Sequence, residues 1–172
     1  MEETILYKLT DSLFIYRDKD GKERLIYIAG PSQEHYIQII NMKEIENNVN
    51  IAIKRYAAFF ETDAKENLNK TMLFIFLLKV KLYEEYILRI LLGHMLFDEY
   101  DQLTKDNKLA SIIAEYLLNK EPLSKVVKDL IKGIIEDTNK FNKLYSLFKD
   151  VTFGMPKYYI EHIYREFLFV YS

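Results

Sequence analysis

Cysteine and tryptophan are absent from this 172-residue sequence, and proline and glycine are scarce. Without cysteine the chain cannot form disulfides, bind zinc through thiolates, hold iron–sulfur clusters or use thiol catalysis. With only 3 Pro and 5 Gly, the composition suits a helical protein better than a turn-rich β-sandwich. The net charge of −2, from 24 basic and 26 acidic residues, excludes a polybasic or strongly acidic protein.

Long hydrophobic runs without charge are absent as well. The most apolar stretch lies between Met72 and Phe97, and its five charged side chains are too many for a membrane span. We therefore predict a buried central helix and no membrane partner. Two acidic residues, Glu2 and Glu3, follow Met1, at a place where a signal peptide would carry basic residues. We therefore expect a cytoplasmic protein. Abundant isoleucine and lysine are typical of AT-rich genomes, such as those of some archaea and viruses.

The first 40 residues are rich in β-forming side chains. Residues 13–17 and 24–28 are predicted strands, and the polar segment 18–23 between them contains Gly21, which can adopt a positive φ. This pattern predicts a β-hairpin. The segment 34–40 fits a third strand or an early helical turn, and its periodicity does not distinguish the two.

From residue 41 onward, apolar side chains recur at helical spacing. Asn41 and Glu44 resemble a capping box that opens a helix over 42–60. The next predicted helix ends at about Glu99. Further predicted helices span 106–119, 122–136, 139–149 and 157–169. The expected fold is therefore mainly α: a bundle of five or six helices over 41–172, packed as one domain with the hairpin of residues 1–40.

Arg89 and His94 are five residues apart in the segment Arg89-Ile90-Leu91-Leu92-Gly93-His94. This spacing resembles the R-x4–6-H motif of HEPN-type ribonucleases, which are small helical domains. The resemblance implies RNA cleavage without a metal, with Arg89 stabilising the phosphate and His94 serving as acid and base across a dimer interface. The family usually has a polar residue after the arginine, and this chain has Ile90.

A structural interpretation of the same residues stands beside the catalytic one. On a straight helix, residues five apart point about 140° away from each other, so convergence needs a helix break or a dimer. The alternative is that Arg89 pairs with Glu85, and His94 with Asp98, each four positions apart.

Two acid–histidine pairs raise the question of a metal. His94 with Asp98, and His162 with Glu166, are each spaced to share one helical face, and packed helices could bring the pairs together. The Glu-x-x-His spacing of di-iron bundles is absent, and such pairs are common on solvated faces. We expect neither a metal nor another cofactor.

Lysines gather in the C-terminal part of the chain, where they alternate with aromatic residues. The lysines that could contact phosphates are Lys125, Lys128, Lys132, Lys140 and Lys143. Basic side chains beside aromatic ones suit phosphate contact and base stacking, so a small nucleic-acid-binding subunit is one hypothesis. The alternative is a solvated face whose lysines pair with acidic residues four positions on. The absence of arginine from this segment favours that alternative.

Aromatic residues crowd the predicted last helix. The candidate partner contacts are Tyr158, Tyr159, Tyr164 and Phe167. Tyrosine is common at interfaces because it combines a large apolar face with a polar tip. Our leading hypothesis is a non-enzymatic helical interaction module, an accessory subunit or inhibitor in a larger assembly. Its C-terminal helices would bind a protein partner or a second copy of the chain. The alternative is that these aromatic residues form the core.

Overall fold

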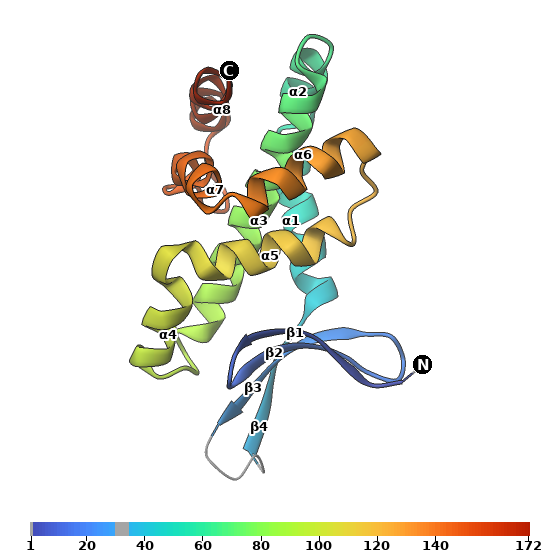
Figure 1. Cartoon of the computed structure of the whole chain (residues 1–172), viewed down its shortest axis with the longest axis vertical. Coiled ribbons are helices and arrows are strands. Elements are labelled where there is room, and N and C mark those ends of the chain that lie inside the picture. The colour runs from blue at the N-terminus through green and yellow to red at the C-terminus, as the bar shows by residue number, and fades with distance from the viewer. Residues whose placement is uncertain (1, 30–34) are drawn as a thin grey trace.

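The chain begins with a β-sheet and continues as a helical bundle, as Figure 1 shows for the computed structural model. The structure describes residues 2–29 and 35–172. The strands are β1 (Thr4–Thr10), β2 (Leu13–Arg17), β3 (Glu23–Ala29) and β4 (His35–Asn41). The helices are α1 (Met42–Lys54), α2 (Ala57–Ala64), α3 (Leu68–Leu91), α4 (Phe97–Thr104), α5 (Lys108–Leu118), α6 (Lys125–Glu136), α7 (Thr138–Tyr145) and α8 (Lys157–Tyr171). Short 3-10 helices follow α4 (η1, Lys105–Asn107) and α7 (η2, Ser146–Phe148). The predicted mainly α fold with an N-terminal β-hairpin is confirmed.

The predicted hairpin is the β2–β3 pair. In its turn, Gly21 has a φ of +79°, which only glycine adopts without strain. One carboxylate oxygen of Asp18 accepts hydrogen bonds from the backbone N–H groups of Asp20 and Lys22, both at 2.9 Å. The other oxygen of Asp18 pairs with Arg24 at 3.1 Å. These contacts fix the register of the two strands.

The sheet is larger than the predicted hairpin. Its antiparallel strands lie in the order β1-β2-β3-β4, so each strand pairs with its neighbour in sequence. The segment 34–40, which fitted either a strand or a helical turn, belongs to the strand β4 from His35 onward. Glu34 lies outside the described residues. The strand β1 was not predicted. Its pairing with β2 slips between Ile5 and Tyr7 and again between Lys8 and Thr10, so its side chains do not alternate regularly.

Two of the predicted helices are each split in the structure. The helix predicted over 42–60 ends at Lys54, and α2 begins at Ala57 after a short turn. In that turn, the Tyr56 hydroxyl donates a 2.9 Å hydrogen bond to the carbonyl of Met155. The helix predicted to reach about Glu99 ends at Leu91, just before Gly93, which lowers the helical propensity there.

The predicted buried central helix is α3. It contacts α1, α2, α5, α6 and α8, so it has neighbours on nearly all sides. Its buried residues are Thr71, Leu73, Phe74, Phe76, Leu77, Leu78, Val80, Leu82, Tyr83, Ile87 and Leu91. A helix that is apolar on all sides is stable only when other elements surround it, and this one organises the core.

The core joins α8 to α3 through one polar contact among aromatic rings. The hydroxyls of Thr71 and Tyr164 lie 2.6 Å apart and share a buried hydrogen bond. The rings of Phe59 and Phe74 meet the Tyr164 ring edge-on, with centroids 5.1 and 5.0 Å away. This geometry is the favoured one for aromatic pairs, and it fixes the rotation of α8 about its axis.

The sheet contacts the bundle through α1, α4 and α5, and its contacts with α5 centre on two tyrosines. The Tyr7 and Tyr116 rings pack edge-on with centroids 5.7 Å apart. The Tyr116 hydroxyl donates to the Glu23 carboxylate at 2.5 Å, and Lys120 contacts the same carboxylate at 3.1 Å. Burial, followed by the hydrogen bond to Glu23, raises the pKa of Tyr116 well above its usual value, so this hydroxyl stays a donor.

The buried hydroxyl pair predicts a specific mutational pattern. We expect Tyr164→Phe to lower the free energy of unfolding by about 1–3 kcal/mol, because it leaves the Thr71 hydroxyl without its partner in the core. Adding Thr71→Val removes the unpaired hydroxyl, so the double variant is expected to recover most of that loss. Urea unfolding of the two single variants and the double variant measures the coupling. Strictly additive losses would contradict the assigned hydrogen bond.

Candidate functional site

The exposed face of α8 carries large side chains in a regular row. Tyr158, His162, Arg165 and Phe169 follow one another at spacings of four, three and four residues, which places them on one side of the helix. The side chains of Tyr158 and Phe169 are 73% and 84% exposed. Arg165 lies over the rings of Phe59 and Tyr164 at 5.8 and 5.5 Å from their centroids. We call these four residues the α8 face.

The predicted partner contacts lie on different sides of this helix. Tyr158 belongs to the α8 face, and Tyr159 is half-buried and packs against the core. Tyr164 and Phe167 are fully buried, so packing accounts for them. The sequence pattern missed Phe169, whose exposure could have been found from its helical spacing to Tyr158.

A second exposed apolar surface lies in the loop between α3 and α4. Leu92, Leu96 and Phe97 are 61%, 69% and 79% exposed. These residues were predicted to lie in a buried helix, and this prediction is wrong because α3 ends at Leu91. The only signal of the break in the sequence is Gly93. We call Leu92, Leu96 and Phe97 the α3–α4 tip.

The structure places Arg89 and His94 in separate surroundings. The helix break between them supplies one condition for the HEPN-type arrangement. Arg89 nevertheless pairs with Glu85, as the structural interpretation predicted. His94 is exposed on the loop. Its predicted helical pairing with Asp98 is wrong, because α3 ends before His94 and α4 begins only at Phe97.

Glu85 anchors a small pocket beside Arg89. Its second oxygen accepts the backbone N–H of Phe153 at 2.8 Å, and the Arg89 guanidinium lies 6.0 Å from the centroid of the Phe153 ring. Arg89 and Phe153 line a cavity of about 290 Å³ together with Tyr86 and with Arg55 at the C-terminus of α1, and Glu85 lies outside this lining. We call it the arginine pocket. His94 is not among its lining residues.

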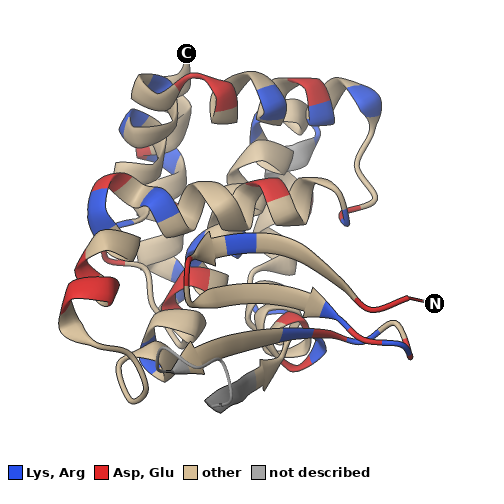
Figure 2. Ribbon diagram, turned by 60° about the horizontal axis from the view of Figure 1, so that its bottom comes forward, with Lys and Arg blue, Asp and Glu red and all other residues tan. Residues whose placement is uncertain are grey.

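The lysines of the nucleic-acid hypothesis form no ion pair with a described carboxylate, so the pairs expected at four-residue spacing are not formed. Lys140 instead lies 5.7 Å from the Tyr171 ring centroid. The neighbouring aromatic residues, Phe141, Tyr145 and Phe148, are buried and cannot stack on a base. Figure 2 shows basic and acidic segments interspersed along the helices. The lysines therefore lie on a mixed surface.

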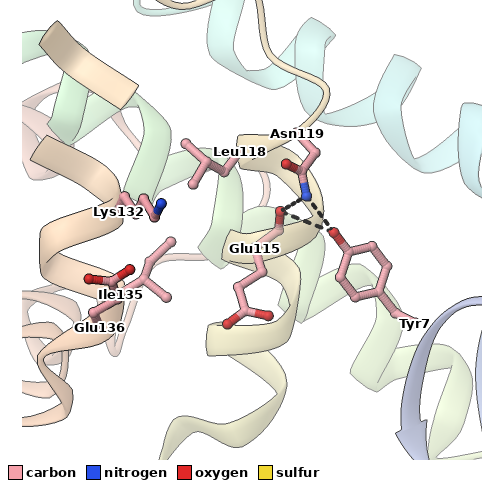
Figure 3. A pocket seen from close by; sticks show the side chains of 7 residues that line it. All are labelled: Tyr7, Glu115, Leu118, Asn119, Lys132, Ile135 and Glu136. Atoms are coloured by element: carbon pink, nitrogen blue, oxygen red, sulfur yellow. Dashed lines mark hydrogen bonds between the residues drawn. The ribbon is translucent and has the colours of Figure 1, made fainter. Parts of the chain in front are cut away.

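Lys132 illustrates this mixture. It lines a pocket of about 220 Å³ between α5 and α6, together with Glu115 and Glu136 (Figure 3). On the opposite wall, Asn119 donates to the Tyr7 hydroxyl at 2.7 Å and to the Glu115 carbonyl at 3.1 Å. With two carboxylates to one ammonium, this pocket does not favour a phosphate.

Within the described part of the chain, no cluster of three or more histidine or acidic side chains is arranged to hold a metal. His162 contacts Glu166 at 3.1 Å on the exposed side of α8, as an isolated pair. No described helix combines the length and apolarity needed to cross a membrane.

Comparisons with known proteins provide no relative. No protein-family model matches the sequence, and no curated protein or solved structure matches it. Function must therefore be argued from the residues of this chain alone.

One buried carboxyl group lies apart from these surfaces, on α3. Burial raises the pKa of Glu84, and the Lys81 ammonium at 3.6 Å offsets part of that rise. Tyr145 packs near it, and its pKa is raised first by burial and then by the Glu84 charge. The pair lies at the edge of the core, where 12% of the Glu84 side chain is exposed.

The raised pKa of Glu84 predicts a pH effect on stability. Folded Glu84 keeps its proton to a higher pH than in the unfolded chain, where its pKa is about 4.5. Its contribution is therefore greatest below that pH and is lost as the pH rises through the folded pKa. We expect the stability of the wild type relative to Glu84→Gln to fall between about pH 4 and pH 7. Urea unfolding of both proteins across this pH range tests the prediction, with Glu61→Gln at an exposed position as the control. If the unfolding free energies of wild type and Glu84→Gln change with pH in parallel, the prediction is wrong.

Proposed function

We propose that this protein is a non-enzymatic interaction module, an accessory subunit or inhibitor that binds a protein partner through the α8 face. The observation that carries the proposal is the exposure of Tyr158 and Phe169 at the two ends of a row that also holds Arg165. Aromatic and arginine side chains dominate the energetic centres of protein interfaces. The compartment that we propose for this activity is the cytoplasm.

The way α8 is held supports this proposal. Tyr164 and Phe167 anchor the opposite side of the helix in the core, so the α8 face is presented on a fixed scaffold. A surface fixed before binding loses little conformational entropy when a partner docks. From Tyr158 to Phe169 the row spans about 16 Å along the axis, a length that one groove of a partner can cover.

The position of α8 also supports it. In Figure 1, α8 and the C-terminus lie at one end of the molecule, and the sheet lies at the other. A partner docked on the α8 face would leave the sheet uncovered. The row fits an apolar groove on the partner that receives Tyr158 and Phe169.

Nucleic-acid binding through Lys125, Lys128 and Lys143 is the second candidate function. The observation in its favour is that these ammonium groups have no carboxylate partner among the described residues. It ranks second because the nearby aromatic rings are buried, which leaves phosphate contact without base stacking. The HEPN-type ribonuclease ranks third, since Arg89 is held by Glu85.

Substitutions on the α8 face test the interaction proposal. Chemical cross-linking in the source cells, followed by purification, identifies the proteins that contact the wild type, and binding to the purified partner is then measured. We expect the double variant Tyr158→Ser, Phe169→Ser to weaken that binding at least about 30-fold, the effect of removing one or two interface hot spots.

A matched control makes the result specific. The double variant Leu96→Ser, Phe97→Ser removes similar exposed apolar area from the α3–α4 tip, and we expect it to bind with unchanged affinity. Sedimentation of the isolated protein shows whether the partner is a second copy of the chain. If the α8 variant binds as tightly as wild type, or only the tip variant loses binding, the proposal is wrong.

A further inference from the structure

The arginine pocket gathers positive charge without acidic residues in its lining. Two of the five arginines of the chain, Arg55 and Arg89, meet here from α1 and α3. Arg89 is paired with Glu85 behind the pocket, but Arg55 has no carboxylate partner among the described residues. Among the described residues, no carboxylate contact therefore balances the charge of Arg55 at this site.

Two other pockets differ in this respect. The pocket between α5 and α6 includes Glu115 and Glu136 in its lining. A second groove lies between the sheet turn and the bundle, where the ammonium group of Lys120 is paired with Glu23 and that of Lys43 with Glu46. The arginine pocket alone among these has cationic side chains and no carboxylate in its wall.

Contacts with Glu85 and the Phe153 ring hold the Arg89 guanidinium in place, and Gly154 leaves room for the Arg55 side chain beside it. Glu85 fixes Arg89 and the backbone of Phe153 at once, and the Phe153 ring packs edge-on against Tyr86 with centroids 6.1 Å apart. Gly154, with a φ of +82°, has no side chain on the side of Arg55, whose Nη1 lies 3.9 Å from where a Cβ would stand. A guanidinium fixed in this way loses less entropy on binding an anion.

We propose that the arginine pocket binds a small phosphate monoester. The phosphate would lie between Arg55 and Arg89, because guanidinium groups donate paired hydrogen bonds to phosphate oxygens and a monoester carries close to two negative charges at neutral pH. The organic part would contact Ile51 and the aromatic wall. The volume of about 290 Å³ lies at the lower end of small-molecule sites, so the ligand is no larger than a mononucleotide.

Calorimetric titration of the full-length protein tests this assignment with four probes. AMP and ribose 5-phosphate share the phosphate, adenosine lacks it, and inorganic phosphate lacks the organic part. We expect AMP or ribose 5-phosphate to bind with a Kd below about 1 mM, inorganic phosphate to bind more weakly, and adenosine not to bind. Affinity for the monoester should fall as salt rises.

Three variants separate the pocket from general charge effects. Arg55→Gln removes the unpaired guanidinium and leaves the Arg89–Glu85 contact intact, so we expect at least about a tenfold loss of affinity. Ile51→Glu places a carboxylate at the exposed rim and should weaken binding similarly. Lys19→Gln, in the sheet turn, removes the same charge elsewhere and should bind as wild type.

The outcomes decide the proposal without reference to a protein partner. It is overturned if no monoester binds at millimolar concentration, if adenosine binds as well as AMP, or if inorganic phosphate binds as tightly as both monoesters. It is also overturned if both pocket variants bind like wild type. Circular dichroism checks that Arg55→Gln is folded, and Ile51→Glu decides the matter if it is not, because Ile51 is 64% exposed and contributes little to the core.

Discussion

The burial of α3 is the constraint on which the rest of this structure depends. A helix of 24 residues that is apolar on nearly every side cannot remain in water, so other elements must enclose it. The helices α1, α2, α5, α6 and α8 do so, and each needs to bury only one of its own faces. Their outer faces are left free to meet other molecules. The proposed partner surface on α8 lies on this outer layer, and the arginine pocket lies where the C-terminal part of α3 meets the end of α1.

The aromatic composition follows from the same arrangement. The core has aliphatic side chains together with phenylalanine and tyrosine rings, and the rings around Phe74 pack in tilted and edge-on arrangements. Tyrosine hydroxyls then need partners inside the protein. The Tyr164 hydroxyl shares a hydrogen bond with Thr71, and the Tyr56 hydroxyl donates to a backbone carbonyl. The Tyr116 hydroxyl donates to Glu23 at the junction with the sheet. These bonds give the helices and the sheet fixed relative positions, which pre-orders the outer surfaces for binding.

Local signals in the sequence were sufficient where one residue determines the geometry. Gly21 predicted the hairpin turn, and Asn41 predicted the start of α1. Periodicity failed at residues 92–97, because it assumes that apolar residues are buried and here they are exposed. It also could not assign the tyrosines of α8, which occur on both sides of the helix. The arginine pocket depends on tertiary packing: Arg55, Arg89 and Phe153 are far apart in sequence, and no spacing rule connects them.

Native-state hydrogen exchange tests most directly the claim that α3 organises the fold. If every surrounding helix depends on α3, its buried amides open only when the whole protein unfolds. The free energy of their exchange should then equal the free energy of global unfolding, with α6, α8 and the sheet opening at equal or lower values. If the amides of α3 open at a lower free energy than those of α6 or α8, the core is organised elsewhere, and this account of the fold is wrong.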